Sequence, residues 1–228
     1  MNIERNITEI RKRIEAAAAK SGRRGGDITV VAATKYAAAD IIESLSEYNI
    51  FAAGENRAQD FLDKYALIDN PEIEWHFIGQ LQTNKVKYII DKVKLIHSAD
   101  RLPLVEEIER QCELKNIDRA DVLIEVNLGG EAQKGGISPD KALEFYESVK
   151  PYKRVRVRGL MTVMPINNLI TDGEKRRNLY LQMKRLYDIL KDKDKDTDIL
   201  SMGMSDDFET AIECGSTMIR LGRVLFKD

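Results

Sequence analysis

The run Ile28-Thr29-Val30-Val31-Ala32-Ala33-Thr34 is short, apolar and rich in β-branched side chains, which predicts a buried strand. A segment with Ile41, Ile42 and Leu45 on one side follows and predicts a helix, and the next apolar run, residues 50–53, predicts a second strand. Neighbouring parallel strands need a crossover connection of this kind. The stretch therefore reads as one strand–helix–strand unit.

The same alternation continues to the end of the chain. Further strands are predicted at residues 74–78, 95–97, 122–127, 155–163, 199–202 and 218–221, and helices at 58–67, 85–93, 104–114, 142–149, 175–190 and 208–214. Ile3, Ile7, Ile10 and Ile14 recur at helical spacing and predict an extra helix over residues 3–20. We read the charged run 191–196 as a solvated connection.

Eight strand–helix units predict an α/β fold, a single (β/α)8 TIM-like barrel with an extra N-terminal helix, as one domain over residues 1–228. An open doubly wound sheet is the alternative. Two features favour the barrel: no Gly-x-Gly-x-x-Gly follows the first strand, and no change in composition marks a second domain.

Composition narrows the class of protein. The 228 residues include 36 Lys and Arg against 38 Asp and Glu, a formal net charge of -2, which gives no electrostatic signal for nucleic acid or an anionic membrane. No uninterrupted apolar stretch is long enough to span a bilayer, and residues 1–5 do not begin a signal peptide. Cys112 and Cys214 are too few for a disulfide framework. We expect a cytoplasmic monomer.

Lys35 is the first candidate for chemistry. Side chains alternate along a strand, so Val31, Ala33 and Lys35 share one face, and Lys35 stands at the mouth of the barrel. Small Ala33 leaves an apolar floor beneath the ammonium, which disfavours the charged form and makes the amine a nucleophile toward an aldehyde. The alternative is an ordinary surface lysine at a strand end.

The stretch Leu200 to Phe208 is the second candidate. Gly203 permits close backbone approach, and Ser205 is a possible helix N-cap followed by two aspartates. Barrels often hold a phosphate in the loops after strands seven and eight, so this loop and residues 219–223 predict an anion site. An ordinary capped helix is the alternative.

The two histidines have no metal-ligand spacing, and we expect no bound metal. His76, between Trp75 and Phe77, is either a satisfied core imidazole or a site residue. The cysteines are expected to pack in the core.

Several blocks resemble the pyridoxal phosphate homeostasis protein family. They are residues 31–35, Gly54-Glu55-Asn56-Arg57-Ala58-Gln59, His76 to Lys85, Val126-Asn127, Glu131 to Gly135, Gly159-Leu160-Met161-Thr162 and Leu200 to Ser205. They span nearly the whole chain. The resemblance implies a barrel similar to the N-terminal domain of alanine racemase, with pyridoxal 5′-phosphate (PLP) as cofactor.

The resemblance also implies roles for single residues. Lys35 would hold PLP as a Schiff base, and Arg220 would face the pyridine nitrogen. Ser205, Gly222 and Arg223 would hold the phosphate, the last two through backbone amides. The pocket would further be lined by Asn56, His76, Met161 and Ser201.

Three functions remain open from the sequence. The first is a PLP-binding protein that stores, buffers or delivers the cofactor inside the cell, with PLP and apo forms of PLP-dependent enzymes as partners and no catalytic residues. The alternative is a PLP-dependent racemase-like enzyme. Arg220 disfavours it because a guanidinium opposes protonation of the ring nitrogen, and the eight units leave no chain for the second domain that supplies the opposing base in such enzymes. The third is a barrel that binds a phosphorylated metabolite non-covalently.

Overall fold

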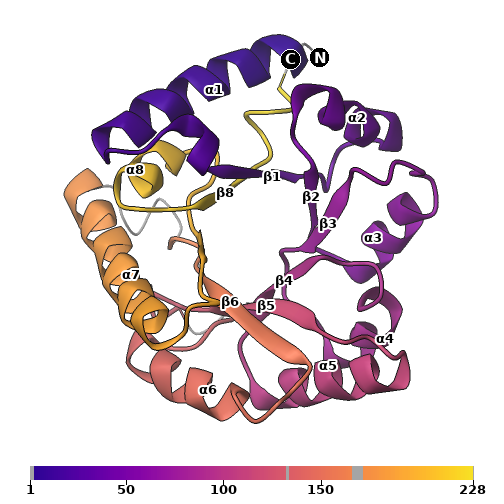
Figure 1. Cartoon of the computed structure of the whole chain (residues 1–228). Helices are drawn as coiled ribbons and strands as arrows, with labels where there is room; N and C mark the ends of the chain where they lie inside the picture. The colour runs from indigo at the N-terminus through magenta and orange to yellow at the C-terminus, as the bar shows by residue number, and fades with distance from the viewer. Residues whose placement is uncertain (1–2, 132–133, 166–171, 228) are drawn as a thin grey trace.

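The computed structural model describes residues 3–131, 134–165 and 172–227. Eight parallel strands form a closed barrel in chain order, and β8 pairs with β1 to complete it (Figure 1). The strands are β1 Thr29–Ala33, β2 Ala52–Glu55, β3 Glu74–Phe77, β4 Leu95–Ala99, β5 Ala120–Glu125, β6 Val155–Met161, β7 Ile199–Ser201 and β8 Met218–Leu221. The predicted (β/α)8 barrel is confirmed, and the open sheet is excluded.

Helices surround the barrel, and the additional helix α1 lies beside α8 (Figure 1). They are α1 Ile3–Lys20, α2 Ala39–Ser44, α3 Ala58–Tyr65, α4 Val86–Ile89, α5 Leu102–Leu114, α6 Ala142–Val149, α7 Gly173–Lys193 and α8 Phe208–Glu213. Within the described ranges, no helix combines the length and the apolar character that a bilayer crossing requires. Ala132 and Gln133, in the predicted block 131–135, lie outside the described residues.

Several elements extend beyond their predicted limits, β2 and α7 among them. Strand β2 continues through Gly54 to Glu55, a charged residue that is fully buried and accepts a hydrogen bond from the Thr34 hydroxyl (2.7 Å). Helix α7 continues to Lys193, so residues 191–193 are helical and the prediction of a solvated connection from residue 191 is wrong. Two lysines in the last turn complement the helix dipole, which favours the extra turn.

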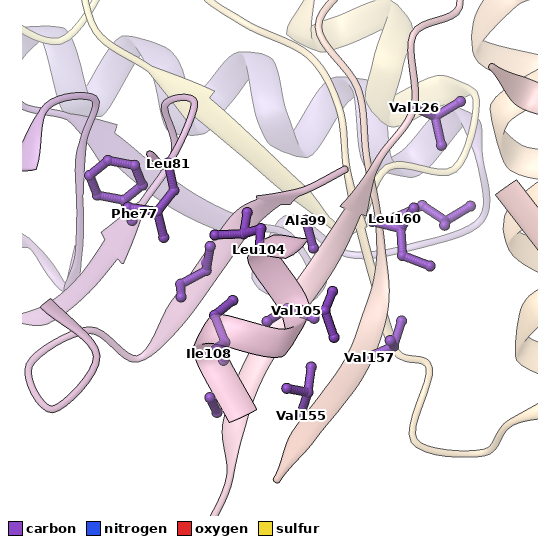
Figure 2. Packing of buried hydrophobic residues seen from close by; sticks show 14 of the residues in the cluster. Phe77, Leu81, Ala99, Leu104, Val105, Ile108, Val126, Val155, Val157 and Leu160 are labelled. Atoms are coloured by element: carbon purple, nitrogen blue, oxygen red, sulfur yellow. The ribbon is translucent and has the colours of Figure 1, made fainter. Parts of the chain in front are cut away.

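The main hydrophobic core lies between the strands and the surrounding helices. In Figure 2, Leu104, Val105 and Ile108 of α5 lie close to Val155 and Val157 of β6, and all five are buried. A smaller cluster fills the barrel itself and consists of Val31, Ala52, Leu95, Leu123, Met161 and Met218. Burial of these side chains on both faces of the sheet is what parallel strands require.

Successive side chains of β1 lie on opposite sides of the sheet, as the alternation predicts. Val31 belongs to the cluster inside the barrel, whereas Ala32 packs against α1 and α8 on the outside. Val31 lies opposite Arg220 of β8 in the strand pairing. The inward face of β8 therefore brings Arg220 into the barrel, directly above the apolar layer.

Candidate functional site

A cavity of about 540 Å³ opens at the carboxyl ends of the strands. Its walls come from β1, β8 and the segments that follow β1, β2, β3, β6, β7 and β8. The residues predicted for the site that line it are Lys35, Asn56, Ser205, Arg220, Gly222 and Arg223. The barrel fold thus brings together six of the nine predicted residues from four separate segments of the chain.

Lys35 lies at the mouth of this cavity, two residues past the end of β1. Its side chain is exposed, and its Nζ lies 4.8 Å from the ring centroid of Tyr36, which is 85% exposed. Lys35 lines the cavity together with Ala33, as the alternation predicts, but its exposed side chain means that the expected shielding of the amine by an apolar floor is wrong. The amine is accessible from solvent and from the cavity alike.

Asn56 is the first residue after β2, and it is brought to the cavity by close backbone packing. A Cβ on Gly79 would lie 2.2 Å from the carbonyl oxygen of Asn56, so only glycine fits at that position. The two loops after β2 and β3 are therefore in direct contact. This packing fixes the wall from which Asn56 faces the cavity.

The segment after β7 forms the opposite wall, and the Ser205 hydroxyl accepts a hydrogen bond from the backbone N–H of Gly222 (3.3 Å). Ser205 is not a helix N-cap, so that prediction is wrong: α8 begins at Phe208, and the Asp207 carboxylate accepts instead from the Met204 N–H (2.8 Å). Asp206 and Asp207 were predicted to lie in the first turn of the helix, but they lie in the turn before α8.

The two aspartates of this loop are both engaged. Asp206 is exposed and forms an ion pair with Arg223, while Asp207 is buried and bound to the backbone. The Asp206 charge is therefore partly neutralised by an arginine that also lines the cavity. This arrangement lessens the repulsion that two carboxylates would exert on an anion.

Arg220 forms the polar floor of the cavity and is only 3% exposed. Its Nη1 donates to the Ser201 carbonyl (3.0 Å) and hydroxyl (2.5 Å), and its Nη2 donates to the Thr162 carbonyl (2.6 Å). Burial lowers the pKa of Arg220, and Tyr180, Glu125 and Asp207 oppose that effect. All the hydrogen bonds that hold this buried cation come from neutral oxygens of the described residues.

The other three predicted residues lie deeper in the barrel and do not line the cavity. His76, Met161 and Ser201 are buried beneath it. His76 Nδ1 lies 3.0 Å from His97 Nε2, and Ser201 contacts Arg220 directly. His76 is thus a hydrogen-bonded interior imidazole, connected to the cavity floor through other side chains.

Two interior polar residues were not among the nine residues predicted for the site. His97 is fully buried on β4, and Glu125 ends β5, where burial raises the pKa of its carboxyl to about 7, with Asp100 adding to the rise and Arg220 opposing it. The alternation that places Leu95 inside the barrel also places His97 there, and this signal could have identified it.

The remaining chemistry of the described residues is limited. Nowhere in residues 3–131, 134–165 and 172–227 do three His, Cys, Asp or Glu side chains gather closely enough to hold a metal ion. Cys112 and Cys214 are free and buried, as predicted for packing residues, and burial raises the pKa of both thiols, that of Cys112 to about 11.

Comparison with protein families and curated proteins points to the same group. The family model described as "Alanine racemase, N-terminal domain" matches residues 1–228. The pyridoxal phosphate homeostasis protein of Aquifex aeolicus is 40% identical over 229 residues, covering 100% of this chain and 99% of that protein. The protein of the same name from Escherichia coli is 34% identical and covers 99% and 96%.

Solved structures agree with the fold. PipY of Synechococcus elongatus, solved with PLP bound, superimposes with a TM-score of 0.78 at 26% identity, covering 88% of this chain and 93% of that one. Alanine racemase of Clostridium difficile superimposes with a TM-score of 0.79 at 14% identity, over 100% of this chain and 59% of the racemase. At that identity the racemase shares the barrel with this chain.

Proposed function

This chain belongs to the pyridoxal phosphate homeostasis protein family, and we propose that it binds PLP in the cavity at the carboxyl ends of the strands, covalently through Lys35. In this proposal the protein stores, buffers or delivers the cofactor. The whole chain, residues 1–228, acts as one PLP-binding barrel domain.

One observation carries the proposal: the cavity combines an accessible amine, a buried guanidinium and a group of hydrogen-bond donors. Lys35 stands at its mouth, Arg220 forms its floor, and Ser205, Gly222 and Arg223 form one wall. PLP carries an aldehyde, a ring nitrogen and a phosphate, which are the partners that these three kinds of group bind. The donor set therefore fits the cofactor.

The residues of the chain then take distinct roles. The Lys35 amine holds the cofactor, since a bound aldehyde supplies a carbon that an amine can attack. Ser205, Arg223 and the Gly222 amide bind the phosphate, and Asn56 lines the wall opposite. Arg220 faces the ring nitrogen, with His76, Met161 and Ser201 supporting the site from below. The Gly222 N–H is already exposed to a hydroxyl partner, which an anion can share or replace.

Arg220 limits the chemistry that a ring bound next to it can support. A permanently charged guanidinium at the floor opposes a second positive charge on a ring nitrogen next to it. An unprotonated ring is a weaker electron sink, so a reaction that forms a carbanion at an amino-acid α-carbon is poorly supported. The neutral oxygens around Arg220 leave that positive charge facing the cavity.

Trapping by borohydride tests the proposal. The protein is loaded with PLP, reduced and digested, and the modified peptide is identified by mass spectrometry. We expect the label on Lys35 and its loss in Lys35→Ala, with Lys87→Ala, an exposed lysine on α4, as matched control. Binding without a trapped adduct would favour the non-covalent phosphometabolite barrel.

A second experiment separates carrier from enzyme. Amino acids of single handedness are incubated with the loaded protein in heavy water, and deuterium at the α-carbon is measured. We expect exchange no faster than that of the Lys35→Ala protein. Rapid exchange of one enantiomer by the wild type alone would establish the racemase-like alternative.

The cellular setting is part of the proposal. We expect a monomer. We also expect it in the cytoplasm, because two buried unpaired thiols suit a reducing compartment. Apo forms of PLP-dependent enzymes are the expected recipients. The exposed Tyr36 and Met204 at the cavity leave its mouth accessible to such a partner.

A further inference from the structure

A chain of hydrogen bonds crosses the inside of the barrel beneath the cavity. It runs from Arg220 Nη1 to Ser201 Oγ (2.5 Å), from Ser201 Oγ to His97 Nδ1 (3.3 Å) and from His97 Nε2 to His76 Nδ1 (3.0 Å). The four residues come from β8, β7, β4 and β3, and each is 4% exposed or less. We call this chain of four residues the interior relay.

The chemistry of the groups gives the relay one direction. A guanidinium only donates, so the Ser201 oxygen accepts from Arg220. Among the described residues, the hydroxyl of Ser201 contacts just one acceptor for its own proton, His97 Nδ1. Were that nitrogen a donor instead, the hydroxyl proton would be buried without a partner, which is costly.

The tautomers of both rings follow from this direction. His97 carries its proton on Nε2 and donates it to His76 Nδ1, so His76 carries its own proton on Nε2 as well. Both rings are neutral. Burial lowers the pKa of His76 to about 4, with a smaller effect from Lys94, and burial together with the charges of His76 and Arg220 keeps the pKa of His97 well below its usual range.

The relay matters for Arg220 because it determines how strongly the Ser201 hydroxyl oxygen accepts a hydrogen bond from the guanidinium. A hydroxyl that donates to an imidazole is a stronger acceptor, since hydrogen bonds in a chain polarise one another. Ser201 holds the guanidinium through its carbonyl and its hydroxyl together. Losing the imidazole frees the hydroxyl to rotate and removes one of the constraints on the guanidinium.

We propose that His97 and His76 are positioning residues: they form a neutral, one-directional relay that fixes the Arg220 guanidinium at the cavity floor and so sets the charge that a bound ligand meets. Neither histidine is among the residues that line the cavity. The identity of that ligand rests on the proposed function, whereas the relay itself is a property of the protein alone.

The ligand-free protein provides the first test, because the chain has only two histidines. With 15N-labelled histidine, long-range 1H–15N spectra near neutral pH should show both rings as neutral Nε2–H tautomers. A His97 ring protonated on Nδ1, or on both nitrogens, overturns the proposal whether or not PLP binds.

The second test follows Arg220 itself. Its guanidinium resonances, assigned by their loss in Arg220→Lys, should be sharp in the wild type and broadened by exchange in His97→Leu. His97→Asn keeps an acceptor near Ser201 and should restore them. Unchanged Arg220 resonances in a folded His97→Leu protein would refute the positioning role.

A serine pair covers the case in which His97→Leu does not fold. Ser201→Ala cuts the relay, whereas Ser98→Ala removes a buried hydroxyl that has no hydrogen-bond partner among the described residues and sits next to His97. We expect Ser201→Ala to broaden the Arg220 resonances and move the His97 Nδ1 resonance, and Ser98→Ala to change neither. Equal spectra for the two variants contradict the relay.

The last test adds the ligand. In the proteins loaded with PLP, Ser201→Ala should shift the absorbance maximum of the bound cofactor and raise its Kd by about fivefold, and Ser98→Ala should do neither. If PLP fails to bind the wild type, the proposed function falls while the ligand-free spectra still decide the relay. If PLP binds and both serine variants keep the wild-type absorbance and Kd, the influence of the relay on the cavity is refuted.

Discussion

The ammonium of Lys64 lies 2.6 Å from the carboxylate of Glu55, and that carboxylate is fully buried. The same ammonium donates to the carbonyl oxygen of Thr34 (2.6 Å), the residue directly before Lys35. One lysine of α3 therefore neutralises a buried charge on β2 and holds the end of β1. The backbone that carries Lys35 is fixed from outside the barrel.

Replacing Lys64 tests this arrangement. Lys64→Met leaves Glu55 buried without its cation, which should lower the free energy of unfolding by about 3–5 kcal/mol, measured by urea denaturation. The double variant Lys64→Met with Glu55→Gln should recover part of the loss, because it removes the unpaired charge. A double variant no more stable than Lys64→Met would show that the charge is not the cause.

Lys35→Ala should abolish covalent PLP binding and leave the fold intact. The side chain is exposed and its loss opens no cavity, so the free energy of unfolding should change by less than about 0.5 kcal/mol. The long-wavelength absorbance of the lysine-bound cofactor and the melting temperature of the ligand-free protein measure the two effects. A wild-type spectrum in the purified variant would move the assignment to another lysine, such as Lys134.

Ser205→Ala should separate binding from stability. Because Ser205 does not cap α8, the ligand-free melting temperature should hardly change. Losing one hydroxyl donor to a charged phosphate should raise the Kd for PLP roughly ten- to a hundredfold. A lower melting temperature with an unchanged Kd would make Ser205 a structural residue only.

Glu125 and His76 should oppose each other in the pH dependence of stability. The pKa of Glu125 is raised from its ordinary value of 4.5 to about 7 in the folded protein. Between these two pH values the folded protein keeps a proton on Glu125 that the unfolded chain has released, so stability falls as the pH rises. The lowered pKa of His76, about 4, means that the unfolded chain takes up a proton below 6.5 that the folded protein refuses, so stability rises with pH from 4 to 6.5.

Glu125→Gln removes the contribution of Glu125 to the pH dependence of stability. The variant should gain up to about 3 kcal/mol over the wild type above pH 7 and nothing at pH 4, measured as free energies of unfolding in urea. Glu144→Gln, an exposed glutamate on α6, is the matched control and should follow the wild type. A pH-independent difference between Glu125→Gln and the wild type would contradict the assigned pKa.

The strands were predictable because each is a run of apolar side chains buried on both faces. Glu55 was not predictable from that pattern, since its charge is satisfied by Lys64 nine residues later and by Thr34, the residue that follows β1, and these contacts exist only after folding. The helical turn over residues 191–193 was not predictable, because it rests on the neighbouring buried Leu190 and not on an apolar pattern of its own.

The sequence predicted which strand ends carry the site residues, but not how their side chains are arranged. Alternation along β1 correctly placed Val31 inside the barrel and Lys35 at the cavity, but it did not predict that the Lys35 side chain is exposed to solvent. The capping pattern at Ser205 was overridden by its contact with the Gly222 amide. The link between His97 and Ser201 joins residues 104 positions apart, beyond the reach of local patterns.

The junction between the two ends of the chain has a consequence for synthesis. The Asn6 side chain donates to the carbonyl oxygens of Leu225 (3.0 Å) and Lys227 (2.8 Å), and β1 has β8 as its second neighbour. A nascent chain emerging from the ribosome thus carries an open sheet edge on β1, and an uncovered apolar face on α1, until its last strand is made. Through that interval the earliest segment depends on chaperones or on speed to escape aggregation.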